Sequence, residues 1–354
     1  MTNVAGRRPE SAALANLGML CLSGLSARQL ARCLPPLIRG ALAADPIGLF
    51  WCDAAGAMQD AWVENPGFLS SQVLHSGNIW RQQNPDAWPR FADNVLAGPV
   101  AGVLLPYQND GFWGSDFYKG SYATIGVRHV MDAVVHDGCR PHGCFLIMRS
   151  ASAGAFLPDD VDLARDIAEL VLPCFLADSQ PPPSSRRYPG GLAIVASDGD
   201  ITYCDRAAHQ SLWTLARAGD RPMIDDVNDD VEKLLRRFCG EDVDLARSLG
   251  HHEVRRFTRW GNFALRYDRT DHGQVVISFD QLLPFAAHVA MMIARLDLSP
   301  RRVIACWLLV RGLTRKEIAW TMNLSAETVN DHLDQVFAAL GVNTAVAAMR
   351  HFSD

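Results

Sequence analysis

The sequence lacks any apolar run of the roughly 18 residues that a membrane-spanning helix needs. Near its start, Arg7 and Arg8 precede an apolar stretch that superficially resembles an export signal. Glu10 and Asn16 interrupt this stretch, which is better explained as an ordinary amphipathic helix. We therefore expect a cytoplasmic protein with no membrane partner.

Cysteine is sparse: nine residues in 354 are too few for a disulfide scaffold, and an odd number cannot all pair within one chain. His136, Cys139, His142 and Cys144 have a spacing that zinc ligands can use. The apolar runs on both sides predict a β-hairpin instead, in which these side chains point to different faces. We expect reduced thiols, no bound metal and no cofactor, and keep a metal or redox sensor as the alternative.

A surplus of basic residues is missing as well, because 33 Lys and Arg face 39 Asp and Glu, for a net charge of -6. This balance argues against a chain that binds nucleic acid or membrane over its whole surface, although a small DNA-binding module can lie within an acidic chain. With 49% hydrophobic and 20% charged residues, the composition is that of a globular protein. The length favours about two to three domains.

Catalytic and phosphate-binding motifs are also absent. The sequence has no G-x-x-x-x-G-K-[ST] loop, and no paired aspartates follow a first strand as in receiver domains. Asp60, Ser70, Ser71 and His75 could be assembled into a triad on paper, but no nucleophile elbow supports one. We expect a protein that is not an enzyme.

A Pro-, Ser- and Gly-rich segment, residues 178–191, predicts a linker between two folded regions. Before it, Ser26 and Gln29 predict a capping box that opens a helix to about Ala44. Strands follow, then a closing helix that Asp159 can cap. The apolar face of that helix comprises Leu163, Ile167, Leu170, Val171 and Cys174. This order, with F-x-x-x-D at the start of the last helix, resembles a GAF domain over about residues 26–176.

After the linker, residues 191–205 predict a strand, a turn and a strand that lead into a helix. Residues 253–280 predict three more strands, separated by turns at Gly261-Asn262 and at residues 271–273. The pattern resembles a degenerate PAS-like domain. A connecting helix then places Phe285, Val289, Met292 and Ile293 at helical spacing, either as core or as a signalling or dimer helix.

The last residues predict four short helices. Thr314 with Glu317 forms a capping box, Asn323-Leu324 makes a tight turn, and Ser325 caps the third helix, while Asn343 caps the last. The third helix buries one apolar face made of Val329, Leu333, Val336, Phe337 and Leu340, and Gly341 ends it. The segments L-x-L-S-P-R, G-L-T-R-K-E-I-A, L-S-x-E-T-V-x-x-H and F-x-x-L-G-V resemble the LuxR-type helix-turn-helix over residues 296–352. An ordinary helical bundle is the alternative.

This resemblance implies that the third helix enters the major groove of DNA. The expected phosphate contacts are Arg315 and Lys316, and the expected base contacts are Thr328, Asn330, Asp331 and Gln335. His332 matches the family motif and is expected to be a partly buried structural residue. The family commonly carries basic residues where this chain has Glu327, Asn330, Ala339 and Ala345, and six basic residues face six acidic ones over 296–354. We therefore expect weak non-specific affinity and a shallow salt dependence.

Aromatic residues are dense in the first region. Such rings can form the core or line an apolar pocket with polar tips. We expect a pocket for a hydrophobic or aromatic metabolite. The candidate ligand-binding residues are Trp51, Trp62, Trp80, Trp88, Trp113, Phe117 and Tyr118.

The predicted fold class is α+β, with GAF-like and PAS-like antiparallel-sheet domains followed by a four-helix all-α helix-turn-helix domain. The predicted boundaries are 1–177 (GAF-like), 178–191 (linker), 192–282 (PAS-like), 283–297 (connecting helix) and 298–354 (helix-turn-helix). We expect a ligand-responsive transcriptional regulator whose partners are operator DNA, a small-molecule effector and a second copy of the chain. RNA polymerase is a further candidate partner. An interaction protein with a decayed DNA-binding domain remains another alternative.

Overall fold

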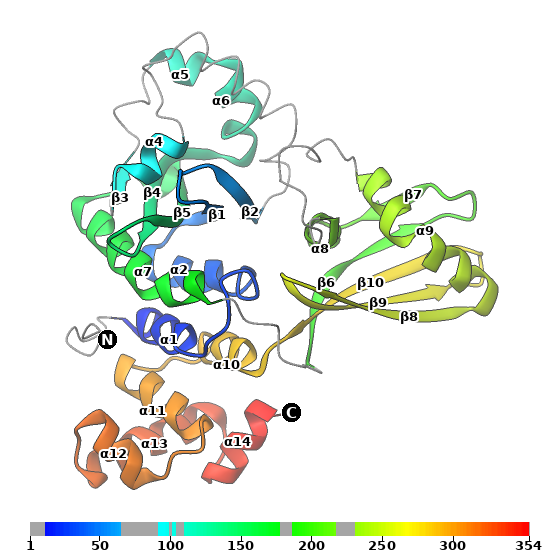
Figure 1. Ribbon diagram of the computed structural model, residues 1–354. Helices are drawn as coiled ribbons and strands as arrows, with labels where there is room; N and C mark the ends of the chain where they lie inside the picture. The colour runs from blue at the N-terminus through cyan, green and yellow to red at the C-terminus, as the bar shows by residue number, and fades with distance from the viewer. Residues whose placement is uncertain are drawn as a thin grey trace.

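The computed structural model describes residues 11–64, 91–98, 101–103, 110–177, 186–216 and 231–353. Two α+β units, each built on a five-stranded antiparallel sheet, are followed by a helical C-terminal region (Figure 1). The predicted mixture of antiparallel sheets and a C-terminal helical domain is confirmed. Within the described residues, no helix is both long and apolar enough to cross a membrane.

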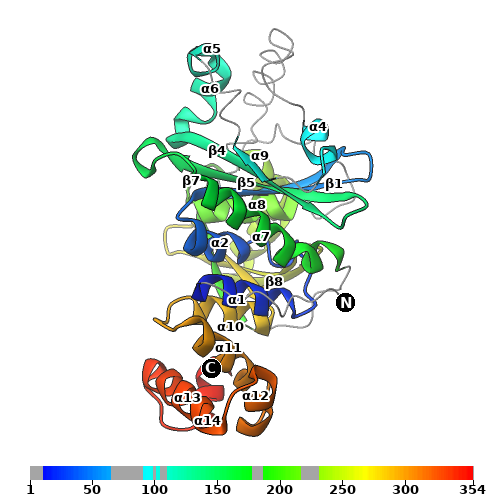
Figure 2. The same ribbon diagram turned by 90° about the vertical axis from the view of Figure 1, so that its left-hand side faces the viewer.

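The first unit has a sheet of strand order β2-β1-β5-β4-β3. Helices α1, α2 and α7 lie on one side of it, and α4, α5 and α6 lie toward the other side (Figure 2). Ile167, Val171 and Cys174 of α7 are buried, as the apolar spacing predicts. The bounds are α1 (Ala12–Cys21), α2 (Leu34–Leu42), β1 (Asp45–Cys52), β2 (Met58–Val63), α4 (Phe91–Leu96), β3 (Ala101–Val103), α5 (Asp110–Gly114), α6 (Asp116–Gly120), β4 (Val127–His136), β5 (Pro141–Ser150) and α7 (Pro158–Leu176).

Two helix starts differ from the prediction. Ser26 and Gln29 do exchange hydrogen bonds, of 3.1 and 3.4 Å, but residues 27–33 form turns and the helix begins only at Leu34. Pro35 and Pro36 have no N–H to donate to the preceding turn, so they fit only the first turn of a helix. At α7, Asp160 rather than Asp159 accepts the hydrogen bond from the N–H of Leu157, at 2.8 Å.

The second unit repeats this plan with the order β7-β6-β10-β9-β8. In both sheets the first strand lies between the second and the fifth, and the third strand is at the edge. Helices α8 and α9 cover one face of the second sheet (Figure 1). The bounds are β6 (Arg186–Val195), β7 (Ile201–Cys204), α8 (Arg206–Ala216), α9 (Val231–Leu249), β8 (His251–Thr258), β9 (Gly261–Arg269) and β10 (Val275–Leu283).

The predicted linker is too long at its C-terminal end, because β6 begins at Arg186 and pairs there with Leu283. The pairing shifts register near Pro189 and the two glycines that follow it. A Cβ on Gly190 would lie 2.5 Å from the carbonyl oxygen of Phe279, and Gly191 has φ +113°. These glycines therefore let the strand bend closely past its neighbours, which their composition alone made look like a loop.

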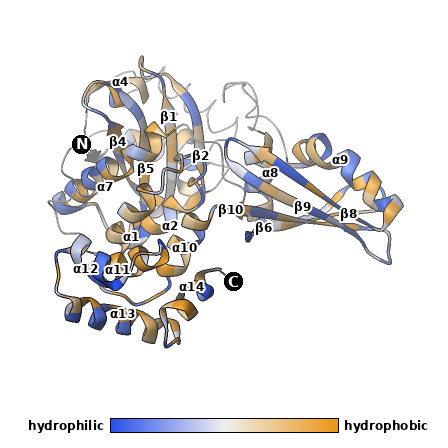
Figure 3. Ribbon diagram, turned by 60° about the horizontal axis from the view of Figure 1, so that its bottom comes forward, coloured by the Kyte–Doolittle hydropathy of each residue, from blue (hydrophilic) through white to orange (hydrophobic). Residues whose placement is uncertain are grey.

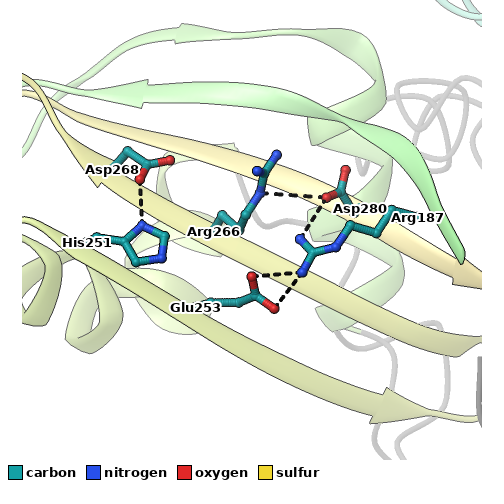
Figure 4. A network of polar contacts seen from close by, with 6 residues as sticks. All are labelled: Arg187, His251, Glu253, Arg266, Asp268 and Asp280. Carbon is teal, nitrogen blue, oxygen red and sulfur yellow. Dashed lines mark hydrogen bonds and ion pairs between the residues drawn. The ribbon is translucent and has the colours of Figure 1, made fainter. Parts of the chain in front are cut away.

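The other face of the second sheet carries an ion-pair network between β6, β8, β9 and β10 (Figure 4). Arg187 donates to both carboxylate oxygens of Glu253, at 2.7 and 2.8 Å, and to Asp280 at 3.3 Å, and Arg266 lies 3.8 Å from Asp280. The hydrogen bonds from Arg187 lower the pKa of Glu253. The network ties four strands together by their side chains.

The C-terminal region begins with α10 (Phe285–Ile293). Its buried Val289 and Ile293 belong to the core, while Phe285 remains 46% exposed, so the helix serves largely as core. It is followed by α11 (Pro300–Val310), α12 (Arg315–Met322), α13 (Ala326–Leu340) and α14 (Ala345–Ser353). In Figure 3, α10 is mostly hydrophobic, whereas α13 carries both hydrophilic and hydrophobic residues along its length.

Helix α1 joins the first unit to this C-terminal region. It was predicted to be amphipathic, but it is packed against α2, α7, α10 and α11 and is buried on most sides. Asn16, only 1% exposed, donates to the carbonyl oxygen of Ala290 and accepts from Nε1 of Trp307, both at 2.8 Å. Arg311 also donates to the carbonyl oxygen of Met19 at 3.1 Å. The helical end is therefore held against the first unit by buried polar contacts as well as apolar packing.

Candidate nucleic-acid interface

Helices α12 and α13 are joined by the predicted tight turn. Glu317 accepts from the N–H of Thr314 at 2.7 Å, and Thr314 Oγ1 accepts from the N–H of Glu317 at 3.4 Å, which completes the capping box. Asn323 takes the left-handed conformation, φ 51°, and ends α12. Ser325 Oγ then accepts from the N–H of Thr328 at 3.1 Å and starts α13.

The five apolar residues predicted for the inner face of α13 are all buried. They pack against α11 and α12, so the opposite side of α13 faces solvent. Gly341 ends the helix at φ 68°, as predicted. The last helix differs slightly: Thr344, rather than Asn343, accepts the capping hydrogen bond, from the N–H of Ala347 at 3.1 Å.

The predicted DNA-contacting residues fall into two groups. Arg315 and Lys316, in the first turn of α12, and Asp331 and Gln335, on α13, are all exposed. Thr328 and Asn330 are half-buried at the two edges of the exposed side, and Thr328 Oγ1 lies 2.8 Å from Ser325 Oγ. The Oδ1 atom of Asn330 is buried without a hydrogen-bond partner among the described residues.

The exposed side of α13 is acidic. Glu327, Asp331 and Asp334 are exposed, and no Lys or Arg occurs between residues 326 and 349. Counting charges over the whole domain hides this concentration, but their helical spacing on one side would have revealed it. This side of α13 therefore repels phosphates, and the nearest exposed cations are those of α12.

His332 is half-buried, and its Nε2 atom is buried without a partner in the part of the chain that the structure describes. Burial lowers the pKa of His332, Arg302 and Arg301 lower it further, and Asp331 opposes the change. A neutral histidine in this position suits a packing role rather than contact with a base.

The candidate ligand-binding aromatics separate into two places. Trp51 and Trp62 are each 4% exposed on β1 and β2, and Trp51 lies 5.4 Å from the ring of Phe175 and 5.3 Å from that of Trp260. Trp113, Phe117 and Tyr118 lie instead on α5 and α6 and pack around Phe112. Trp80 and Trp88 lie outside the described residues. The set therefore does not form one pocket wall.

The residues weighed as metal ligands lie in the turn and strands of the predicted hairpin. His142 Nε2 contacts Asp137 at 2.8 Å, His136 Nδ1 accepts from the N–H of Gly138, and Cys144 is buried with Val95 and Val134 while Cys139 is exposed. Among the described residues, no group of three His, Cys, Asp or Glu is arranged to hold a metal ion.

Residues 288–352 match the family described as bacterial regulatory proteins, luxR family. This match identifies α11 to α14 as a LuxR-type helix-turn-helix domain, which the capping, the turn and the buried face described above agree with. No curated protein matches the chain.

Two solved structures of VqmA from Vibrio cholerae are similar to part of the chain. One, described as a VqmA dimer in the absence of target DNA, is 16% identical with a TM-score of 0.17 and covers 46% of this chain and 81% of its own. The other, described as a VqmA–ligand–DNA complex, is 17% identical with a TM-score of 0.18 and covers 46% of this chain and 80% of its own. At these TM-scores the likeness carries no argument about this chain.

Proposed function

We propose that this protein is a ligand-responsive transcriptional regulator that binds operator DNA through α12 and α13. The observation that carries the proposal is the complete helix-turn-helix of residues 314–340, in the domain that matches the luxR family. Its capping box, left-handed turn residue and five buried apolar side chains fix the angle at which α13 is presented. The exposed side of α13 would lie in the major groove.

Within this interface, Arg315 and Lys316 are proposed to contact phosphates, because they are exposed cations at the start of α12. Gln335 and Asp331 are proposed to read bases, since an amide pairs with adenine and a carboxylate accepts from cytosine. Asn330 and Thr328 would contact the rims of the groove. The unpartnered Oδ1 of Asn330 supports a rotation of that side chain toward DNA.

The acidic side of α13 limits how the protein can bind. Few cations near phosphate release few counterions, so affinity for random DNA should be low and its salt slope shallow. A homodimer that reads two half-sites would compensate, because the second contact becomes intramolecular. Val342, Val346 and Met349 near the end of the domain are the proposed dimer contacts, and Val346 is 60% exposed.

The two sheet units are proposed to be the sensor, one GAF-like and one PAS-like, for a small aromatic or hydrophobic effector. Their shared strand order supports a pair of related modules. Binding would shift the placement of the two DNA-binding domains in a dimer, and so alter contact with RNA polymerase at a promoter. The direct packing of α1 on α11 provides the physical connection.

The experiment that tests the proposal is a footprint of the full chain on the DNA upstream of its own gene, followed by titrations on the protected site and on random duplex. Lys316→Ala should weaken binding to both DNAs alike, whereas Gln335→Ala should weaken binding to the protected site only. Lys119→Ala, an exposed lysine on α6, is the matched control. Absence of any protected site, or equal losses for Gln335→Ala on both DNAs, would overturn the assignment.

A second candidate is an interaction protein that has lost DNA binding. The three exposed carboxylates of α13, with no nearby Lys or Arg on that helix, favour it. It predicts no protected site at any salt concentration in the same footprint.

A further inference from the structure

A cavity of about 280 Å³ lies between the two α+β units. The first unit contributes Arg28 and Arg32, from the segment before α2, and Trp62 of β2. The second contributes Gln210 of α8, Trp260 and Gln281. In Figure 1, β2 and α8 face each other across this junction. The volume is just below the range of about 300–1,000 Å³ that is usual for drug-sized ligands.

Positive charge gathers around this cavity. Arg28 Nε lies 3.1 Å from Asp60 Oδ2, and Arg259 Nη2 lies 3.0 Å from the same oxygen, so two guanidinium groups share one carboxylate that is 2% exposed. Arg32 donates to the carbonyl oxygen of Pro189 at 2.6 Å and has no ion pair printed at that contact distance. Burial lowers the pKa of Arg32, an effect that Asp205 and Asp280 partly oppose. A ligand anion would offset the cost of burying this charge.

One strong hydrogen-bond donor of the cavity wall is unused. Trp260 is 1% exposed, and its Nε1 atom has no hydrogen-bond partner among the described residues. Buried indole N–H groups are normally paired, because an unpaired one costs free energy. The Nε2 atoms of Gln281 and Gln210 donate to the carbonyl oxygens of Trp260, at 3.2 Å, and Val63, at 2.9 Å. Their amide oxygens therefore remain as acceptors.

The wall thus combines guanidinium groups, a free indole N–H and aromatic side chains. We propose that this cavity binds a small aromatic molecule that carries a carboxylate or phosphate group. The anion pairs with Arg28 and Arg32 and accepts from Trp260 Nε1, and the ring packs against Trp62 and Trp260. This site rests on the proposed function in one respect only: it would be the effector site of the sensor.

The position of the cavity gives the ligand a mechanical role. Gln210 with Val63, Arg32 with Pro189 and Arg259 with Asp60 are all contacts between the two units. A ligand held by both sides adds to the same set, so its binding stabilises one relative placement of the units. The predicted ligand-binding residues Trp51 and Trp62 lie at this junction, and Trp260 is the partner that completes it.

The test uses the full chain labelled with 5-fluorotryptophan and two probes, benzoate and phenyl phosphate, with benzylamine as the cationic control. Trp260→Phe assigns the Trp260 signal in the ¹⁹F NMR spectrum. We expect at least one anion to shift that signal saturably and to raise Tm, and benzylamine to do neither. No saturable shift with either anion would overturn the proposal.

Variants then locate the site. Arg32→Gln and Trp260→Phe should each weaken binding of the anion tenfold or more, measured by calorimetry and by the Tm shift, with near-UV circular dichroism confirming the fold. Arg165→Gln, an exposed arginine on α7, and Trp320→Phe, an 86% exposed tryptophan on α12, are the matched controls and should bind as the parent does. Unchanged affinity in a folded Arg32 or Trp260 variant would overturn the site.

DNA binding is measured on the same samples. A footprint without anion binding overturns only the cavity proposal, whereas anion binding without a footprint overturns only the proposed regulator.

Discussion

The buried hydrogen bonds of Asn16 allow a quantitative prediction about the contact between the first unit and the DNA-binding end. Asn16→Ala removes both bonds. The carbonyl oxygen of Ala290 keeps a second donor, the N–H of Ala294 at 3.0 Å, so only the indole N–H of Trp307 is left unpaired. An unpaired buried donor costs about 1–3 kcal/mol and the lost bond to Ala290 adds about 1 kcal/mol, so the free energy of unfolding should fall by about 2–4 kcal/mol.

Trp307→Phe leaves the other partner unpaired, because Asn16 Oδ1 loses its donor. The double variant leaves neither group unpaired across this contact. The loss in the double variant should therefore be smaller than the sum of the single losses by about 1–2 kcal/mol.

Urea denaturation followed by circular dichroism measures these free energies, and hydrogen exchange in α11 shows whether the loss is local. Asn343→Ala, an exposed asparagine of the same domain, is the control and should change stability by less than about 0.5 kcal/mol. If the losses of the two variants add within about 0.5 kcal/mol, the bond does not couple these helices and the reasoning is wrong.

Three further predictions concern other parts of the molecule. Thr314→Ala removes the reciprocal cap of α12 and should cost about 1 kcal/mol in urea denaturation, with Thr314→Ser restoring most of it. Glu327→Gln with Asp334→Asn should raise affinity for random duplex severalfold at low salt and little at 1 M salt, where charges are screened; anisotropy titrations that show no difference would refute the acidic-side argument. Burial raises the pKa of Asp132 to about 7, so the folded state keeps a proton that the unfolded chain releases, and stability should fall as pH rises from about 4 to 7. Asp132→Asn should lose this dependence in urea midpoints measured at pH 4.5 and 7.5, and an unchanged pH profile would contradict the assignment.

Local signals in the sequence were sufficient for the helix-turn-helix. Capping residues, the left-handed Asn323 and the spacing of apolar residues act within a few positions, so they are readable without tertiary information. The same signals failed where the chain crosses between elements, as at Pro35 and Pro36, whose missing N–H groups delay a helix that the capping box would start earlier. Helix α9 was not predicted, although Leu235, Cys239 and Val243 have the spacing of a buried face.

The candidate ligand residues illustrate the limit for long-range contacts. Trp51 and Trp62 were singled out because aromatic residues cluster in the sequence, yet the side chain that meets Trp51 is Trp260, about two hundred residues later. No periodicity or motif specifies which face of the second unit lies against the first. The same holds for Asn16 and Trp307, whose pairing depends on how three regions of the chain pack.

The packing of α1 has a consequence for synthesis of the chain. Asn16 is made among the first residues, but Ala290 follows 274 residues later, which takes roughly 14–55 s at typical rates of translation. Until then, the side of α1 that faces α10 and α11 has no cover, and neither does it in a chain cut short before α10. A truncated sensor should therefore aggregate or recruit chaperones where the full chain does not, so the DNA-binding end also acts as the last piece of the sensor's own fold.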